Sequence, residues 1–275
     1  MPRRERRSVA AVEAVGPYTL LRLARGGLDP GVPGQFFMLE APGRLLPRAL
    51  SLCLAPPGEL AFLIDAVGPG TQALCELTAG EEIHVFGPLG NGYRLDVDRP
   101  LLVGGGIGIA PLPYLAEALP GAPAVLGFRT AAHAEAAALL PGAEVCIDPT
   151  FVTELIDTGC DLLACGPEPM LRAVAALCPD AQLAWEAPMA CGYGACYGCV
   201  VEIGGELKRL CVEGPVLVPL RQVHAGLSPA ITRRAAASSV APVALATSAP
   251  CVLASLGARD RETRQHSPKG HGAAA

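Results

Sequence analysis

The chain has 275 residues, a formal net charge of −5, and a hydrophobic share of 51%. This length allows two domains and a small appendage, and the hydrophobic share allows a sizeable buried core. The acidic balance argues against a nucleic acid as the main partner. The 32 glycines and 27 prolines exceed ordinary usage and predict many turns and close backbone approaches.

The N-terminus begins with a basic run, MPRRERRSVAAVEAVGPY, which has no apolar segment of the kind found in signal peptides. We interpret it as a basic leader that runs directly into a first strand, and we expect a cytoplasmic protein. Disulfides are rare in that reducing compartment. We therefore expect the single cysteines in apolar stretches to be small buried hydrophobic residues, namely Cys53, Cys75, Cys146 and Cys160.

Residues 8–87 have the pattern of an all-β domain. Short runs such as YTLLRLA, QFFMLEA, RALSLCLA, ELAFLIDAV and EEIHVFG are separated by Gly/Pro turns, and several alternate apolar and polar residues. Strands this short and closely spaced favour an antiparallel barrel or sandwich. We place this first domain at residues 1–97.

Two motifs of this domain are candidate phosphate-binding features. PRALSLC places Arg48 and Ser51 three residues apart in a strand-like run, where the arginine can pair with a phosphate and the serine can hydrogen-bond nearby. VGPGTQ places Gly68, Gly70 and Thr71 at the start of a probable helix, which can cradle a phosphate. An exposed arginine and a plain turn are equally good explanations, so neither motif decides a function alone.

The pattern changes near residue 100. PLLVGGGIGIAPLPYLAEAL is typical of an apolar strand, a glycine loop and a helix. Strand-like PAVLGF, AEVCID, DLLACG and AQLAWEA follow, together with helix-like FVTELI and EPMLRAVAAL. Strands that alternate with helices predict a parallel sheet covered by helices. We place this α/β domain at residues 98–187.

Two strand-to-helix turns of the α/β domain are candidate nucleotide loops. VGGGIGIAP suits a nucleotide phosphate, although Ile109 stands where the G-x-G-x-x-G fingerprint requires its last glycine. A tight turn without a ligand is the alternative. ACGPEPM is the second turn, with Cys165, Gly166 and Pro167 at its bend. In a parallel sheet both turns lie at the carboxyl ends of strands, where ligands bind.

The most specific motif is CGYGACYGC at residues 191–199. With one later cysteine it forms the pattern C-x4-C-x2-C-x11-C, made by Cys191, Cys196, Cys199 and Cys211. The opening of this pattern is the plant-ferredoxin spacing for a [2Fe–2S] cluster. Structural zinc sites more often use two C-x2-C pairs, and only one is present here. The pattern therefore favours an iron–sulfur cluster over zinc, and zinc over no metal.

The residues around these cysteines suit such a loop. Gly192, Gly194 and Gly198 allow the backbone to bend sharply and to point N–H groups at the cluster sulfurs. The intervening VVEIGGELKRL predicts a hairpin around a Gly-Gly turn that returns the last cysteine to the cluster. We place this cluster lobe at residues 188–224.

Residues 225–275 are rich in Ala, Ser and Pro and show no clear period. The uncharged stretch 235–258 raises a membrane helix as an alternative, but Pro242 and Pro250 argue against it. We predict a disordered tail and no contact with a membrane.

Taken in order, RALS, GPGT, GGGIGIAP, CGPEPM and CGYGACYGC…C resemble the ferredoxin reductase superfamily, and within it the electron transfer subunits of type B dihydroorotate dehydrogenases. The resemblance covers about residues 8–224. It implies an FAD-binding β-barrel, an NAD-binding α/β domain and a C-terminal [2Fe–2S] lobe. It also implies that electrons pass from NADH to FAD and through the cluster to FMN in a separate catalytic subunit, which interconverts dihydroorotate and orotate in a two-plus-two complex.

The resemblance also implies which residues contact each cofactor, and it assigns no separate catalytic residue. For FAD these residues are Arg48, Ala49, Leu50, Ser51, Gly70 and Thr71, with Leu63, Ile64 and Asp65 by position only. For the nicotinamide nucleotide they are Gly104, Gly105, Gly106, Gly108, Cys165, Gly166 and Pro167. The four cysteines match the cluster ligands. One departure is EVCIDPTFVTEL, which is much shorter than the Gly/Asp-rich stretch of the family, so part of the NADH site is expected to be missing or rebuilt.

The sequence is also compatible with two other functions. A related reductase subunit that serves a hydrogenase or a ferredoxin:NADP couple would carry the same motifs. A regulatory or scaffold protein with a structural zinc at the four cysteines would have no flavin and no redox role.

Overall fold

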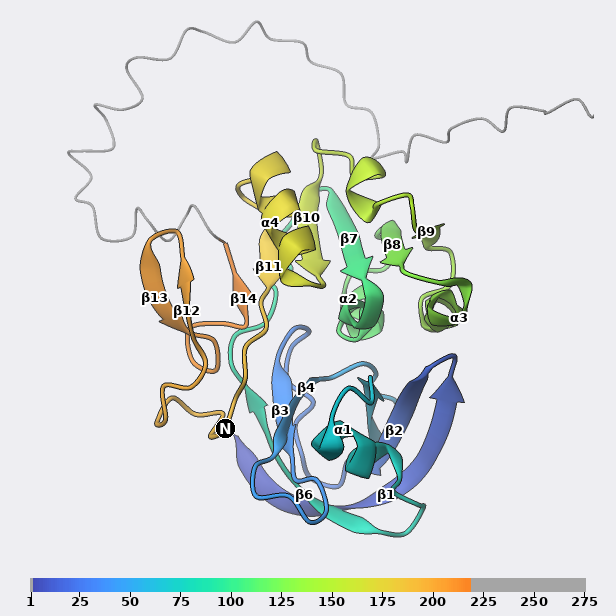
Figure 1. Ribbon diagram of the computed structural model, residues 1–275, viewed down its shortest axis with the longest axis vertical. Helices are drawn as coiled ribbons and strands as arrows, with labels where there is room; N and C mark the ends of the chain where they lie inside the picture. Colours follow the sequence, from blue (N-terminus) through green and yellow to red (C-terminus); the bar gives the residue numbers. More distant parts are fainter. Residues whose placement is uncertain (1, 219–275) are drawn as a thin grey trace, which may run out of the picture.

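The structure is a computed structural model that describes residues 2–218. Two six-stranded sheets and a two-stranded hairpin organise this range. In Figure 1 the first sheet lies below the second, and the hairpin lies beside the second sheet. The predicted tail at residues 225–275 and the end of the predicted lobe at residues 188–224 lie outside the described residues.

The first sheet is antiparallel, as predicted, with the strand order β4-β3-β6-β1-β2-β5. Its elements are β1 (Arg3–Val15), β2 (Tyr18–Ala24), β3 (Phe36–Leu39), β4 (Arg48–Ser51), β5 (Glu59–Ile64), α1 (Pro69–Cys75) and β6 (Glu82–Leu89). The first half of β1 pairs with β6 and the second half with β2, with a register shift between Val9 and Ala11. This shared long strand curls the sheet into a barrel, because an irregularity bends and twists the strand that contains it.

The basic N-terminal run is part of this barrel and is not a separate leader. Strand β1 begins at Arg3, and residues from Arg3 to Ser8 pair with β6. Arg3, Arg4 and Arg6 are exposed, and Arg6 pairs with Glu82. Arg7 is partly buried on the face opposite Arg6 and pairs with Glu5. Of the single cysteines predicted to be buried, Cys75 is only half-buried, and the other three are buried.

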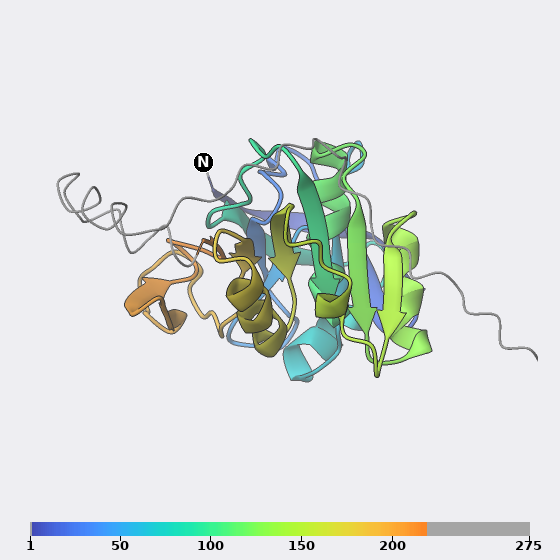
Figure 2. The same ribbon diagram turned by 90° about the horizontal axis from the view of Figure 1, so that it is seen from above.

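The second sheet has the order β14-β11-β10-β7-β8-β9, and all its strands except β14 are parallel. Its strands are β7 (Pro100–Gly105), β8 (Ala124–Phe128), β9 (Glu144–Ile147), β10 (Asp161–Cys165), β11 (Gln182–Ala184) and β14 (Val216–Leu217). The helices are η1 (Gly106–Ile109), α2 (Leu112–Ala118), α3 (Ala131–Ala134), η2 (Glu135–Leu139), η3 (Val152–Glu154) and α4 (Glu168–Leu177). Figure 2 shows α2 and α4 on opposite sides of this sheet.

Alternate residues of β7 explain this layering. Leu101 and Val103 pack with Leu171 of α4, whereas Leu102 packs with Leu112 of α2. A strand buried on both faces has a continuous apolar sequence, as LLV has here. The helix expected for FVTELI is reduced to the single 3₁₀ turn η3, because only its first valine is buried against the core.

The predicted hairpin is present as β12 (Val200–Ile203) and β13 (Glu206–Arg209). Gly204 and Gly205 form its two-residue turn with φ of 62° and 80°, values that suit the turn type of tight hairpins. The chain then returns to the second sheet as β14, which pairs with β11. The cysteine segment is thus attached to this sheet at both ends. The domain limits 1–97, 98–187 and 188–224 stay predictions.

Within residues 2–218, no helix has both the length and the apolar character needed to cross a membrane.

Candidate functional site

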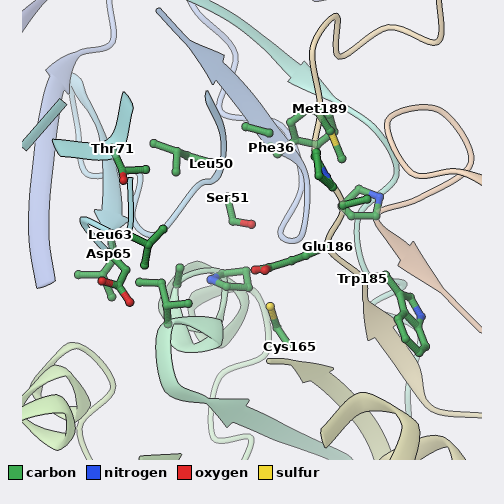
Figure 3. Close-up of a pocket in the computed structure, with 18 residues that line it drawn as sticks. Phe36, Leu50, Ser51, Leu63, Asp65, Thr71, Cys165, Trp185, Glu186 and Met189 are labelled. Carbon is green, nitrogen blue, oxygen red and sulfur yellow. The ribbon is translucent and has the colours of Figure 1, made fainter. Parts of the chain in front are cut away.

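A pocket of about 520 Å³ lies between the first sheet and the carboxyl end of the second. Several residues implied for FAD line it, namely Ala49, Leu50 and Ser51 of β4, Leu63 of β5, Asp65 after it and Thr71 of α1. Cys165, at the end of β10, lines the opposite side. Figure 3 shows Ser51, Cys165 and Glu186 pointing into one shared space. We call this space the flavin pocket.

The position of the flavin pocket follows from the topology of the second sheet. Strand β7 pairs with β8 on one side and with β10 on the other, so chain order reverses between β7 and β10. Ligands of open α/β sheets bind outside the carboxyl ends of the strands at such a switch point. Gly104 and Cys165 are register partners there.

Arg48 and Gly70 make a tight contact at the edge of this pocket. A Cβ on Gly70 would lie 2.1 Å from the Arg48 guanidinium, so this approach requires glycine. The Arg48 Nη1 donates to the Leu46 carbonyl at 2.8 Å, which fixes the side chain beside the start of α1. The Thr71 hydroxyl donates to the Gly68 carbonyl and accepts from its N–H. A guanidinium held beside a helix start fits the diphosphate of a dinucleotide.

Three of the residues implied for FAD do not line the pocket, namely Arg48, Ile64 and Gly70. Ile64 is buried in the barrel core, because its neighbours Leu63 and Asp65 occupy the pocket-facing positions of an alternating strand. The flavin pocket thus has an apolar wall, four polar side chains, and the Arg48 guanidinium beside Gly70 at its edge. These residues fit FAD, whose ring system is flat and largely apolar and whose diphosphate is anionic.

A second pocket of about 500 Å³ borders the glycine loop next to α4, whose Met170 and Ala173 line it. Of the residues implied for the nicotinamide nucleotide, Gly105, Gly106 and Pro167 line it. We call it the nucleotide pocket. Its remaining wall includes Asp148, Thr150 and Phe151, which belong to the shortened stretch. The stretch has therefore kept one wall of a nucleotide-sized pocket.

The other implied glycines serve close packing. A Cβ on Gly108 would lie 2.3 Å from the Cys165 carbonyl oxygen, and one on Gly104 would lie 2.7 Å from Leu126. A Cβ on Gly166 would lie 2.5 Å from the Met170 methyl group. The Gly108 contact thus brings η1 and the second turn close together.

The sequence reasoning missed the segment after β11, where Trp185, Glu186, Ala187, Pro188 and Met189 line the flavin pocket. Glu186 is exposed to the pocket by its surface area, yet desolvation by the protein atoms around it raises the pKa of its carboxyl. Burial likewise raises the pKa of the Cys165 thiol, which stays neutral near pH 7. The signal for this segment was its place between the last parallel strand and the first cysteine.

The four predicted cysteines lie in two pairs. The Cys199 and Cys211 sulfurs are 3.2 Å apart, and both residues are buried. The Cys196 N–H donates to the Cys191 sulfur at 3.4 Å. Further N–H donors aim at sulfur, since Gly194 donates to Cys211 at 3.1 Å.

Hydrogen bonds and burial shift the pKa values of one cysteine from each pair in opposite directions. Burial opposes ionisation of Cys191, but the N–H groups of Tyr193, Cys196 and Ala195 lower the pKa of this thiol to about 6. Burial and the neighbouring Cys199 raise the pKa of the Cys211 thiol to about 12.

This arrangement suits a [2Fe–2S] cluster. A two-iron cluster takes two thiolates at each iron, whereas zinc would draw all four around one ion. Gly192, at φ 79°, packs so closely on Met38 that a Cβ would lie 2.7 Å from that side chain, so the loop is shaped around glycine.

Comparison with known proteins agrees with this geometry. A family model described as the iron-sulfur cluster binding domain of dihydroorotate dehydrogenase B matches residues 186–219. The electron transfer subunit of dihydroorotate dehydrogenase B (NAD(+)) from Bacillus caldolyticus is 36% identical over 246 residues, which is 78% of this chain and 96% of that protein. The chain belongs to the family of dihydroorotate dehydrogenase B electron transfer subunits.

Two further matches extend over much of this electron transfer subunit. The corresponding subunit from Clostridium perfringens is 34% identical over 208 residues, covering 66% of this chain and 83% of that protein. Among solved structures, an NADH-dependent reduced ferredoxin-NADP oxidoreductase has a TM-score of 0.65 and 25% identity, covering 77% of this chain and 87% of that one. The fold is that of ferredoxin reductases with an added iron–sulfur segment, as predicted.

Proposed function

We propose that this chain passes electrons from NADH, through FAD and a [2Fe–2S] cluster, to FMN in the catalytic chain of a dihydroorotate dehydrogenase. The observation that carries the proposal is that the flavin pocket lies between the nucleotide pocket and the cysteine loop. Cys165 and Pro167 are two residues apart and line the two pockets, which brings the nucleotide and flavin sites together.

The cluster side of the flavin pocket is formed by one face of β3. Phe36 lines the flavin pocket, whereas Met38, two residues on, lines a groove beside Cys191 and touches Gly192. Alternate residues of a strand share a face, so this short wall separates flavin from cluster. It excludes water and keeps both cofactors on one rigid strand.

Each cofactor has an assigned set of residues in this proposal. Arg48, Gly70 and Thr71 hold the FAD diphosphate, while β4 and Leu63 to Asp65 flank the ring. Gly105, Gly106 and Pro167 border the nucleotide, and the four cysteines hold the cluster. FAD supplies the conversion of a two-electron hydride transfer into single-electron steps, and a one-electron carrier must accept these.

The outer side of the cysteine loop is where the catalytic chain would approach. Cys196 is exposed, and Tyr193 and Tyr197 beside it are 62% and 64% exposed, whereas Cys199 and Cys211 face the core. Exposed aromatic side chains are enriched at protein interfaces. In this proposal two copies of each chain form a heterotetramer in the cytoplasm.

An anaerobic visible spectrum of the purified chain, with iron, zinc and flavin assayed on the same sample, tests the proposal. We expect one FAD and two irons per chain, and bleaching by NADH. Zinc without flavin would reject it and would make the cysteines a structural clamp. Flavin and iron that NADH does not bleach would reject NADH as the donor.

A second candidate keeps the chemistry and changes the acceptor. The likeness to a ferredoxin-NADP oxidoreductase favours a ferredoxin as that acceptor. Steady-state assays with NADH should reveal electron transfer to the dihydroorotate dehydrogenase catalytic chain. Faster transfer to a ferredoxin than to that chain would favour the second candidate.

A further inference from the structure

Tyr18 opens strand β2 of the barrel, yet it packs on the α/β domain. Its ring meets the His133 ring edge-on with centroids 5.5 Å apart, and only 3% of the residue is exposed. The turn before it is docked too, because a Cβ on Gly16 would lie 2.3 Å from the Ala132 carbonyl oxygen. This contact positions Tyr18 against the nucleotide side of the molecule.

The Tyr18 hydroxyl lies beside the glycine loop. A Cβ built on Gly106 would be 3.9 Å from this oxygen, and Gly106 itself lines the nucleotide pocket with φ 55°. Within residues 2–218 the hydroxyl has no hydrogen-bond partner. The Tyr18 oxygen is not among the fully enclosed unpaired polar atoms of this range, so a ligand can reach it. A ligand atom on the glycine loop would supply the partner.

Arg129 brings a positive charge to the same place. It follows β8 and lines the nucleotide pocket, and it forms no ion pair with the part of the chain that is described. The next residue, Thr130, has its hydroxyl 2.8 Å from the His133 Nδ1, so Arg129 leads directly into the turn that packs on Tyr18. Asp65 lies on the flavin side and its charge acts on Tyr18 as well.

The Tyr18 hydroxyl is protonated and can therefore donate a hydrogen bond. Burial and then the Asp65 carboxylate raise the pKa of the phenol to about 12, against a smaller opposing effect of Arg129. The hydroxyl therefore keeps its proton throughout the physiological range. A phosphate oxygen accepts from a neutral O–H and from a guanidinium at once.

We propose that Tyr18 and Arg129 together bind the diphosphate of NADH where the dinucleotide passes from the nucleotide pocket to the flavin pocket. The inference rests on the proposed function, because it takes NADH as the donor. Tyr18 acts as a binding and positioning residue, reaching from the barrel across the glycine loop.

The test compares Tyr18→Phe with the intact chain in anaerobic stopped-flow reduction of bound FAD. Phenylalanine keeps the ring contact with His133, so folding and FAD content should not change. We expect the half-saturating NADH concentration to rise about tenfold, with the limiting rate nearly unchanged, because one hydrogen bond to a charged group is lost. Tyr114→Phe is the matched control, since its hydroxyl bonds the Gly31 carbonyl outside both pockets.

A hydride donor without phosphate sharpens the assignment. 1-Benzyl-1,4-dihydronicotinamide should reduce the FAD of Tyr18→Phe and of the intact chain equally fast. An equal loss with this donor would overturn the proposal, because Tyr18 would then act on the flavin. An unchanged half-saturating NADH concentration would overturn it too.

Arg129→Gln tests the second member of the pair. We expect a larger rise in the half-saturating NADH concentration, roughly 10- to 100-fold, because a charge is lost. The double variant should lose less than the product of the two single effects, since both groups hold the same diphosphate. Fully multiplicative effects would contradict a shared ligand.

A separate readout distinguishes failure of this inference from failure of the proposed function. If NADH does not reduce the intact chain, ADP-ribose binding measured by calorimetry still reports on the diphosphate site. Weaker ADP-ribose binding by Tyr18→Phe than by the intact chain would support the pair. Equal binding would overturn it.

Discussion

The cysteine loop and the flavin pocket are built in opposite ways. The loop takes its ligands from residues 191–211, and its shape depends on backbone conformations that glycine adopts, as at Gly192 and Gly194. The pocket takes its walls from both sheets, between Phe36 and Pro215. A local site depends on each of its residues, whereas a distributed pocket shares its contacts among many. Substitutions should therefore be nearly all-or-none in the loop and graded in the pocket.

The largest effect is expected at Cys196. Cys196→Ser should remove the cluster and abolish electron delivery to the catalytic chain, because one of four thiolate ligands is lost. FAD should stay bound and should still be bleached by NADH, which separates the two sites. Cys178→Ser is the control, since this free thiol donates to the Thr158 carbonyl and lies outside every site. Iron content and partner reduction are measured together, and unchanged partner reduction in Cys196→Ser would contradict the relay.

A pair of glycines tests whether loop shape matters beyond its cysteines. Gly192 and Gly205 have nearly equal φ, 79° and 80°, but a Cβ meets Met38 at the first and nothing within 4 Å at the second. Gly205→Ala should cost about 1 kcal/mol of stability, roughly 3 °C in Tm, with iron content unchanged. Gly192→Ala adds a steric clash, so it should cost about 3 kcal/mol and lower the iron content. Equal iron content in both variants would mean that only the cysteines define the loop.

A graded effect is expected at Arg48. Arg48→Gln should weaken FAD binding roughly 10- to 100-fold, because a charged donor beside the diphosphate is lost while the pocket walls remain. Equilibrium dialysis of the deflavinated chain against FAD measures this loss. Arg44→Gln, in the exposed loop that precedes β4, should leave FAD affinity unchanged. An Arg48 variant with intact affinity would show that Arg48 serves the fold alone.

The smallest effect is expected at Glu186 and depends on pH. Burial raises the pKa of its carboxyl above the ordinary 4.5, so the native state holds this proton more tightly than the unfolded chain does. Its contribution to stability is complete below pH 4.5 and is lost as pH rises through the raised pKa. Glu186→Gln cannot ionise, so its Tm should match the intact chain near pH 4 and exceed it slightly near pH 8. A Tm difference that does not change with pH would contradict this account.

Sequence patterns predicted the elements whose conformation depends on residues close together in the chain. The strands alternate or run apolar as their burial requires, the Gly-Gly turn closes its hairpin, and the cysteine spacing indicates the cluster. The glycine loop was predicted because its glycines follow an apolar strand and precede a helix-like run, although a tight turn without a ligand gives the same pattern. The family was recognised from these motifs in order.

The parts that depend on distant contacts were not predictable. The place of Trp185 and Glu186 between the last parallel strand and the first cysteine was their only sequence signal, and it does not show that this segment crosses the flavin pocket. The two-residue strand β14 is too short to show any periodicity, yet it attaches the cysteine segment to the second sheet. Tyr18 has the pattern of an ordinary strand residue, and only the docking of two sheets brings it to Gly106. The run FVTELI forms only one turn of helix, and half of its residues are β-branched with low helix propensity.

The central claim is that the nucleotide pocket, flavin pocket and cysteine loop act in series. Anaerobic stopped-flow mixing of the purified chain with NADH, followed at wavelengths that separate flavin from cluster, tests this order most directly. The account predicts that flavin absorbance bleaches first and that cluster bleaching follows it. Cluster bleaching that precedes the flavin, or that proceeds in a chain stripped of FAD, would contradict it.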